Sequence, residues 1–318
     1  MSDLVNKLTM VSISLFVTVL VTACGGGGGD GTTPTLSDSY TGSRTLATVS
    51  NNSAETIAVE AYNGTETANG VSGLVNSVGG GAPAAASPAA ATSRAVSNAL
   101  YRATQTTSAQ GTCGGSASYT ATVNEQTGDF SMTFTFNSFC EPDGLTENVL
   151  NGSMTFSGNI DPTTQEMNHM TVSFGAITST LSDGSEDITL TGSISMTMSN
   201  TNTGTVTMNF VSRDNLTGKT YWVDNYVATS TDNGTYEEVT LSGRFYDHDN
   251  GYVEITTITP GIIYTGDQHP STGILQFDGA NNNSIRLTFL TNTTYQVTAE
   301  LNGDGQYDDI VPEVKTWQ

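Results

Sequence analysis

Residues 129–140 read DFSMTFTFNSFC, and this stretch decides the fold class. Its apolar residues take every second position, and serine, threonine and asparagine fill most of the positions between them. The positions of one parity are Phe130, Met132, Phe134, Phe136 and Cys140. Because successive side chains of a β-strand point to opposite faces, this alternation predicts a strand with one buried face.

The segment that precedes this stretch has the same period of two. Residues 113–123 read CGGSASYTATV. Its positions of one parity are Cys113, Ala117, Tyr119, Ala121 and Val123. Residues 124–129, NEQTGD, form a hairpin loop between the two runs if Val123 pairs with Phe130. A bulge at Gly128 would shift this register by one residue.

The same register places Cys113 opposite Cys140, on the buried face of the hairpin. The chain has three cysteines, and Cys24 has a separate role described below. An even remainder in an oxidising compartment predicts one disulfide between Cys113 and Cys140. Closing the hairpin in this way would add roughly 3–4 kcal/mol in the chain-entropy model.

Short runs rich in β-branched and aromatic residues continue towards the C-terminus. The further runs expected to form strands are 168–175, 204–211, 220–228, 234–246, 251–259, 272–278, 284–290 and 294–301. Three segments that begin at Leu150, Leu190 and Leu241 share the form Leu-x-Gly-x-apolar. Their irregular spacing excludes a solenoid and fits equivalent strands of a meander, in which the glycine marks strong curvature or close packing.

Residues 111–318 are therefore predicted to form a mainly β domain, an antiparallel meander. The meander would form a barrel, a half-barrel or a sandwich, because open sheet edges invite aggregation. A half-open sheet covered by the preceding helices is a further alternative.

Residues 46–110 are expected to form two or three short helices and a low-complexity stretch. Asn52 and Glu55 have capping-box spacing. The first apolar stripe is Ala54, Ile57, Ala58 and Ala61. Weaker stripes lie in 71–78 and 95–103. We expect these small faces to pack against the β domain, and the alternative is that they plug or line a cavity in it.

The N-terminus has the layout of a secretory signal peptide, predicted at residues 1–23. Lys7 precedes an apolar run that is short for a membrane-spanning helix and ends in small residues. Cys24 is followed by five glycines. Such a sequence predicts a flexible tether, expected over residues 24–45.

The four residues Val21-Thr22-Ala23-Cys24 resemble the lipobox of bacterial lipoproteins. The resemblance implies that Cys24 becomes the first residue of the mature chain and carries diacylglycerol and palmitate. Gly25, where an aspartate would signal retention, implies sorting to the outer membrane, with the side of exposure left open. The alternative is an uncleaved helix with a chance cysteine.

Longer stretches carry a second resemblance. They are the Cys-Gly run at 24–29, NSAETIAVEA at 52–61, CGGS at 113–116, FNSFCE at 136–141, STGILQFDGANNNSIRLTF at 271–289, and ELNGDGQYDD at 300–309 with Trp317. Together they resemble a group of uncharacterised Gram-negative lipoproteins. That resemblance implies the location and a β-rich fold, and it implies no catalytic residues.

The formal net charge is −22, from 9 basic and 31 acidic residues. Such a chain repels phosphate backbones, so nucleic acid is excluded as a partner. It also repels anionic lipid headgroups, so the lipid anchor is the one membrane attachment predicted.

Catalysis is not predicted. His169, His248 and His269 lack metal-ligand spacing, and no nucleophile-elbow, zincin or P-loop motif occurs. His248 lies between Asp247 and Asp249, where turn formation is the expected role. An acidic dyad assembled by folding would leave no local signature.

The segment 300–309 resembles the first half of a calcium-binding loop. The oxygen donors expected there are Glu300, Asn302, Asp304 and Asp308. Glutamate stands where the first aspartate is usual, and Val311 stands where a bidentate glutamate is usual. The same residues are typical of a solvated turn, and this alternative is the favoured one. Ca²⁺ is the single cofactor that the sequence suggests.

These patterns predict a lipid-anchored cell-envelope protein of structural or interaction type, with an envelope protein as its partner. The alternative is a binding module that holds an apolar ligand in the β domain, lined by phenylalanine, methionine and valine side chains that include Phe130, Met132, Phe134 and Phe136. A cavity at this face would favour the second prediction, and a packed core would favour the first.

Overall fold

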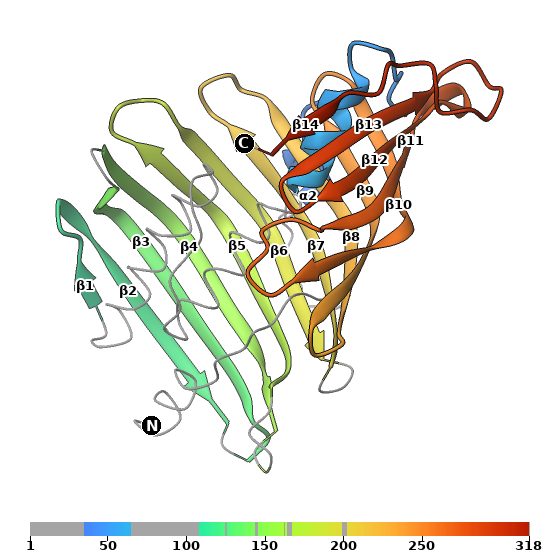
Figure 1. Ribbon diagram of the computed structural model, residues 1–318. Coiled ribbons are helices and arrows are strands. Elements are labelled where there is room, and N and C mark those ends of the chain that lie inside the picture. Colours follow the sequence, from blue (N-terminus) through green and yellow to red (C-terminus); the bar gives the residue numbers. More distant parts are fainter. Residues whose placement is uncertain are drawn as a thin grey trace. The chain divides into compact units, whose positions relative to one another are not determined.

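A computed structural model describes residues 35–64, 108–124, 126–143, 146–161, 163, 167–198 and 202–317. The described strands pair in sequence order in one antiparallel sheet (Figure 1). They are β1 (Ser108–Gln110), β2 (Gly114–Val123), β3 (Asp129–Asp143), β4 (Thr146–Ile160), β5 (Met167–Leu181), β6 (Asp187–Met198), β7 (Thr203–Asp214), β8 (Thr220–Asp232), β9 (Tyr236–Asp247), β10 (Gly251–Tyr264), β11 (Thr272–Asp278), β12 (Ser284–Thr291), β13 (Thr294–Glu300) and β14 (Val314–Thr316). The helical segments are α2 (Leu36–Ser39), a helix at 54–64 and the 3-10 turn η1 (Ala280–Asn282).

The predicted antiparallel meander is confirmed, and each expected run overlaps one observed strand. Among the described residues, β1 and β14 are the two ends of the strand order, so the sheet does not close into a barrel. By internal contacts the described chain divides into two compact units. One contains residues 108–194 and 212–219, and the other contains residues 35–64, 195–211 and 220–317.

Two glycines of the Leu-x-Gly-x repeat, Gly152 and Gly243, lie opposite β-bulges. Gly152, Gly192 and Gly243 have φ angles of 107°, 128° and 133°. In the β4–β5 pair, two residues of β5, 176 and 177, lie opposite the single residue Gly152. In the β8–β9 pair, two residues of β8, 225 and 226, lie opposite the single residue Gly243. A bulge bends its strand and increases the local twist. At Gly152 and Gly243 the repeat therefore marks positions where the opposing strand bends and where its backbone leaves no room for a side chain.

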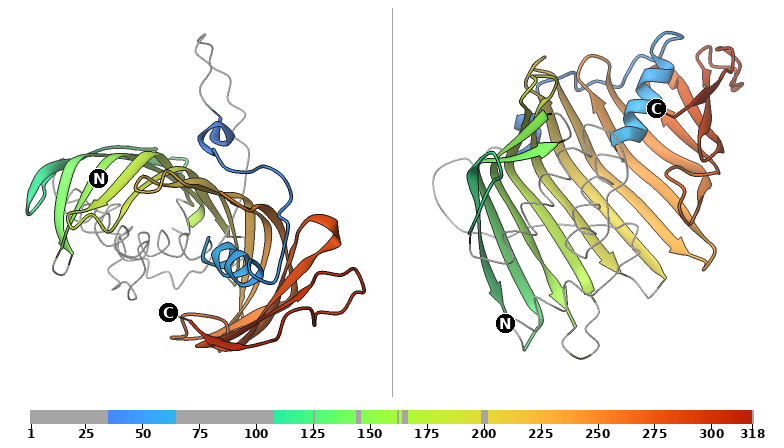
Figure 2. Two further views of the ribbon diagram at one scale, coloured as in Figure 1. Left: turned by 90° about the horizontal axis from the view of Figure 1, so that it is seen from above. Right: turned by 60° about the vertical axis from the view of Figure 1, so that its left-hand side comes forward.

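Helix 54–64 covers one face of its unit. Its predicted apolar stripe, Ala54, Ile57, Ala58 and Ala61, is at most 1 % exposed. The Tyr226 hydroxyl donates a hydrogen bond to the Ala61 carbonyl oxygen at 3.0 Å, and Gly64 lies against Phe245 of β9. Figure 2 shows this helix in blue beside the orange strands. The stripes expected at 71–78 and 95–103 lie outside the described residues.

Residues 35–49, which we call the clasp, include the described part of the expected tether. Tyr40 is 2 % exposed, and its hydroxyl donates to the Asp247 carbonyl oxygen at 2.7 Å. The Ser43 N–H donates to the His248 carbonyl, and the Ala47 N–H donates to the Tyr252 carbonyl. The clasp is thus bonded to the β9–β10 hairpin through both its main chain and a buried side chain.

The chain passes from one face of this hairpin to the other between the clasp and the helix. Tyr40 packs edge-on against Tyr246, with ring centroids 5.5 Å apart. Helix 54–64 approaches Phe245, the neighbouring residue in β9. Successive residues of a strand point to opposite faces. The clasp and the helix therefore hold the sheet from both sides.

Candidate functional site at the disulfide

Cys24, the predicted lipidation site, lies outside the described residues. No helix within the described part of the chain is long and apolar enough to cross a membrane.

Cys113 and Cys140 form a disulfide, as predicted, with their Cα atoms 5.1 Å apart. The predicted register holds from Val123↔Phe130 to Ser116↔Asn137 and then shifts. The shift lies at the cysteine end of the hairpin, where Gly115 and Ser138 have positive φ, and not at Gly128. Cys140 is buried, but the expectation that Cys113 is also buried is wrong. The register shift takes Cys113 out of the predicted alternation and leaves it exposed.

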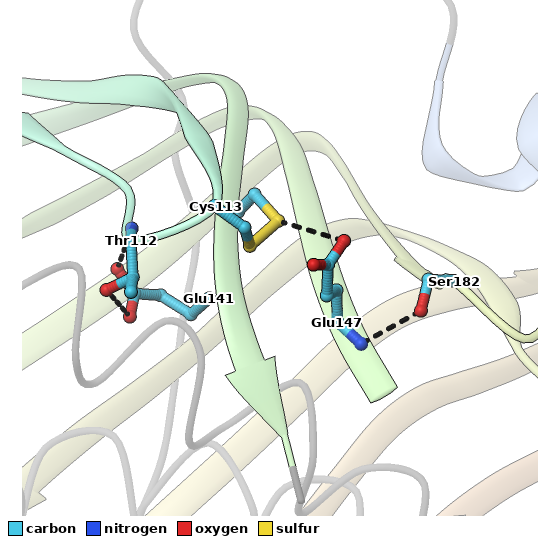
Figure 3. The surroundings of a disulfide bond; sticks show 6 residues. Thr112, Cys113, Glu141, Glu147 and Ser182 are labelled. Carbon is cyan, nitrogen blue, oxygen red and sulfur yellow. Dashed lines mark hydrogen bonds between the residues drawn. A yellow bond between two sulfur atoms is a disulfide. The ribbon is translucent and has the colours of Figure 1, made fainter. Parts of the chain in front are cut away.

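A carboxylate holds the turn before the disulfide. The Thr112 N–H donates to Glu141 Oε1 at 3.1 Å, and its hydroxyl donates to Oε2 at 2.9 Å (Figure 3). Glu141 is 4 % exposed. The Cys113 N–H donates to the Cys140 carbonyl oxygen at 3.3 Å. The turn is fixed by a covalent bond, by main-chain pairing and by a buried charge-assisted contact.

Glu147, on β4, completes a cluster with the two sulfur atoms. Its Oε2 lies 3.9 Å from Cys140 Sγ, and its N–H donates to Ser182 Oγ at 2.9 Å (Figure 3). The potential ligand atoms of Cys113, Cys140 and Glu147 all lie within 4.8 Å of one another. In the part of the chain that the structure describes, no other three His, Cys, Asp or Glu side chains converge in this way.

Sequence reasoning missed Glu147 and Glu141. Glu147 is brought beside Cys140 by the pairing of β3 with β4, in which Cys140 lies opposite Val149. In the sequence, Glu147 is marked only as an acidic residue that follows Cys140 after a short turn. That signal has no specificity until the register of the second hairpin is known.

The C-terminal loop places the predicted calcium ligands differently. Glu300 Oε1 accepts hydrogen bonds from the N–H groups of Asn302 and Gly303. Asn302 Oδ1 accepts from the Asp304 N–H at 2.9 Å, and Asp304 Oδ1 accepts from the Gln306 N–H at 2.8 Å. These are turn-forming contacts.

The carboxylates of this loop do not converge. Glu300, Asp304 and Asp308 do not form a three-residue group within 4.8 Å among the described residues. Asp309, which was not expected to act, accepts from the Leu301 N–H and from Asn302 Nδ2. The observed contacts are those of the turn that the sequence analysis favours, and calcium binding at this loop stays a prediction.

A cleft of about 280 Å³ lies beside this loop. Its lining residues are Asn51, Glu55, Val297, Asp309, Ile310, Val311, Glu313 and Lys315. Lys315 Nζ pairs with Glu313 at 3.1 Å and with Glu55 at 3.5 Å. The hydrogen bond to Glu313 and the charge of Glu55 raise the Lys315 pKa. Lys315 thus pairs with two of the three carboxylates that line the cleft, and the third, Asp309, accepts hydrogen bonds from Leu301 and Asn302.

His248, His269 and Trp317 have structural contacts. His248 Nδ1 lies 3.2 Å from the Thr220 nitrogen, which donates to it. Asp247 Oδ1 accepts from the N–H groups of Asp249 and Asn250, consistent with the turn predicted there. The Trp317 ring stacks on Tyr295, with centroids 4.1 Å apart, and on His269, with centroids 4.6 Å apart.

Comparisons of this chain with protein-family models, with curated proteins and with solved structures give no match.

Proposed function

We propose that this protein is a lipid-anchored outer-membrane protein of structural or interaction type, attached through Cys24 and presenting its β domain without catalysis. The observation that supports this proposal is the clasp. It bonds the chain to the β9–β10 hairpin from Tyr40 onward, and the five glycines 25–29 lie in the sequence between Cys24 and the clasp. The flexible tether predicted from these glycines would let the folded domain stand off a membrane.

The clasp would also resist a mechanical force applied to the domain through its N-terminus. A pull on the tether would act first on the Tyr40–Asp247 hydrogen bond and on the main-chain bonds of Ser43 and Ala47. Because these bonds lie on the hairpin and not on helix 54–64, the load would reach the sheet before it reached the helix. Such an entry point supports a tethered structural role.

The interaction role is favoured over the apolar-ligand alternative by burial. Of the residues that would line the ligand site, Phe130, Phe134 and Phe136 are 5 %, 2 % and 3 % exposed, and Met132 is half-buried. Side chains that are already covered have little surface left to offer an apolar ligand.

Metabolic labelling with palmitate tests the anchor. The wild-type chain should carry label and sediment with the outer membrane, and Cys24→Ala should lose both. Cys113→Ala is the matched control and should keep the label. Label that persists in Cys24→Ala would contradict the proposal.

Mass spectrometry of organic extracts tests the interaction role separately. The sample is the mature chain with Cys24→Ser, exported with a cleavable signal and purified in its folded form. We expect no stoichiometric apolar molecule, and a recovered lipid would instead establish the ligand-binding alternative.

A further inference from the structure

The disulfide and its neighbouring carboxylate form a group that the proposed function does not use. Cys113 immediately precedes β2, and Cys140 and Glu147 lie on β3 and β4, which pair with one another. Their ligand atoms lie within 4.8 Å of one another. Cys113 and Glu147 are exposed, so a reductant and an ion in solution can both reach the cluster.

We propose that reduction of the Cys113–Cys140 disulfide converts this corner into a binding site for a borderline or soft divalent cation of the Zn²⁺ class. The ligands are the two thiolate sulfurs and the Glu147 carboxylate. With the disulfide intact, the sulfurs are bonded to one another and have no charge to offer a metal. The site therefore exists in the reduced chain alone.

The chemistry needs a dithiol or phosphine reductant from outside the protein. A dithiol gives two electrons and two protons to the disulfide, leaves two cysteine thiols and itself becomes a cyclic disulfide. Binding of Zn²⁺ then forms two Zn–S bonds and releases two protons to solvent, because the thiolate is the ligand form.

The ligand set selects the class of metal. Two thiolates with one carboxylate suit Zn²⁺ and its softer neighbours, whereas Ca²⁺ and Mg²⁺ require oxygen ligands alone. Three protein ligands leave the fourth tetrahedral position for water.

The framework around the cluster stays in place when the disulfide opens. Thr112 remains bonded to Glu141, and Cys113 remains bonded to Cys140 through its main chain. Glu147 is held by the Ser182 hydroxyl at its N–H. The Cα atoms of Cys113 and Cys140 are 5.1 Å apart. In the reduced chain, rotation about the two Cα–Cβ bonds can therefore separate the sulfurs so that both bind one ion, and the strands need not move.

Zinc titration of the whole chain tests the proposal. Cys24→Ser is used throughout, so that Cys113 and Cys140 carry the only thiols. The reduced chain, kept in a phosphine reductant, should bind one Zn²⁺ in competition with a chromogenic chelator, and the oxidised chain should bind none. Cd²⁺ in place of Zn²⁺ should give the near-ultraviolet absorption band of thiolate-to-metal charge transfer.

Single substitutions distinguish zinc binding at this cluster from zinc binding to other acidic residues on the surface. Glu147→Gln should weaken Zn²⁺ binding by the reduced chain at least about tenfold. Cys113→Ser and Cys140→Ser should abolish it, and exposed Glu238→Gln is the matched control that should leave it unchanged. Circular dichroism follows the fold in each sample.

Three results would overturn the proposal. They are equal zinc binding by the oxidised and reduced chains, affinity that Glu147→Gln does not change, and a reduced chain that is unfolded and does not refold on adding zinc. The palmitate experiment tests a different residue, so either proposal can fail without the other.

Discussion

Gly152 faces Ala176 across the β4–β5 pair so closely that a Cβ at position 152 would lie 2.6 Å from the Ala176 carbonyl oxygen. Both residues have positive φ, 107° for Gly152 and 53° for Ala176. The bulge thus depends on the missing side chain at position 152.

We expect Gly152→Ala to lower the free energy of unfolding by about 3–4 kcal/mol, since it combines backbone strain with a clash against main chain. Gly184→Ala is the control, because Gly184 has φ 72° but nothing lies within 4 Å of its Cβ position. It should cost about 1–2 kcal/mol. Urea denaturation measures both, and equal losses would show that the contact with Ala176 has no effect.

Loss of the disulfide should destabilise the β2–β3 hairpin. Cys113 and Cys140 are 27 residues apart, and Cys113 is exposed, so Cys113→Ala removes the cross-link with little loss of packing. We expect the free energy of unfolding to fall by roughly 3–4 kcal/mol. Chemical reduction of the wild-type chain should give a similar fall. A loss below about 1 kcal/mol would indicate that the Thr112–Glu141 bonds already fix the turn.

Tyr226 makes stability depend on alkaline pH. It is fully buried, and burial raises the pKa of its hydroxyl well above the usual value. Above pH ~10 the unfolded chain loses this proton and the folded chain keeps it. The free energy of unfolding should therefore fall with rising pH, by about 1.4 kcal/mol per pH unit from this residue.

Replacement of Tyr226 separates this contribution from those of other groups. Tyr226→Phe should flatten the alkaline slope by that amount, and near neutral pH it should cost about 1 kcal/mol through the lost bond to Ala61. Tyr264, which is 50 % exposed, provides the control variant Tyr264→Phe. Urea midpoints between pH 8 and 11 give the slopes, and parallel slopes for wild type and Tyr226→Phe would refute the assignment.

Cleavage by trypsin after Arg44 tests whether the clasp is bonded to the β9–β10 hairpin. The Arg44 guanidinium donates to the Tyr40 carbonyl oxygen at 3.0 Å and also to that of Ser37. We expect Tyr40→Ala to release this segment, because it removes a buried ring and the hydrogen bond to Asp247. Mass spectrometry should then find a product beginning at Thr45 in the variant but not in wild type or in Tyr264→Ala. Equal cleavage of all three would show that Tyr40 does not hold the clasp.

Calcium should have little effect on the C-terminal loop. Glu300, Asn302 and Asp304 already accept hydrogen bonds from the N–H groups of the loop. We expect the melting temperature at 1 mM calcium, roughly the affinity range of weak extracellular sites, to equal that in chelator. A rise that Asp304→Asn abolishes would establish the calcium site instead.

The sequence predicted most of the strands because they alternate between buried and more exposed residues, whereas the short strands β1 and β14 have no buried residue. Phe130, Phe134 and Phe136 of the alternation and the stripe of Ala54, Ile57 and Ala58 are buried, and Met132 is half-buried. Gly152 and Gly243 were correctly predicted as points of curvature or close packing. The site could be predicted less fully, because Glu147 meets Cys140 only through the pairing of β3 with β4.

What the sequence by itself determined is therefore local: the period of each strand, the first helix and the pairing of Cys113 with Cys140. The tertiary structure decided the rest. The shift beyond Ser116 exposed Cys113, because one bulge residue changes the face to which the following residues point. Residues 35–45 of the clasp were predicted to be tether, because the side chains that bury Tyr40, among them Val211, Trp222 and Tyr246, are far away in the chain. Burial of an isolated aromatic residue depends on distant partners, and no local pattern encodes it.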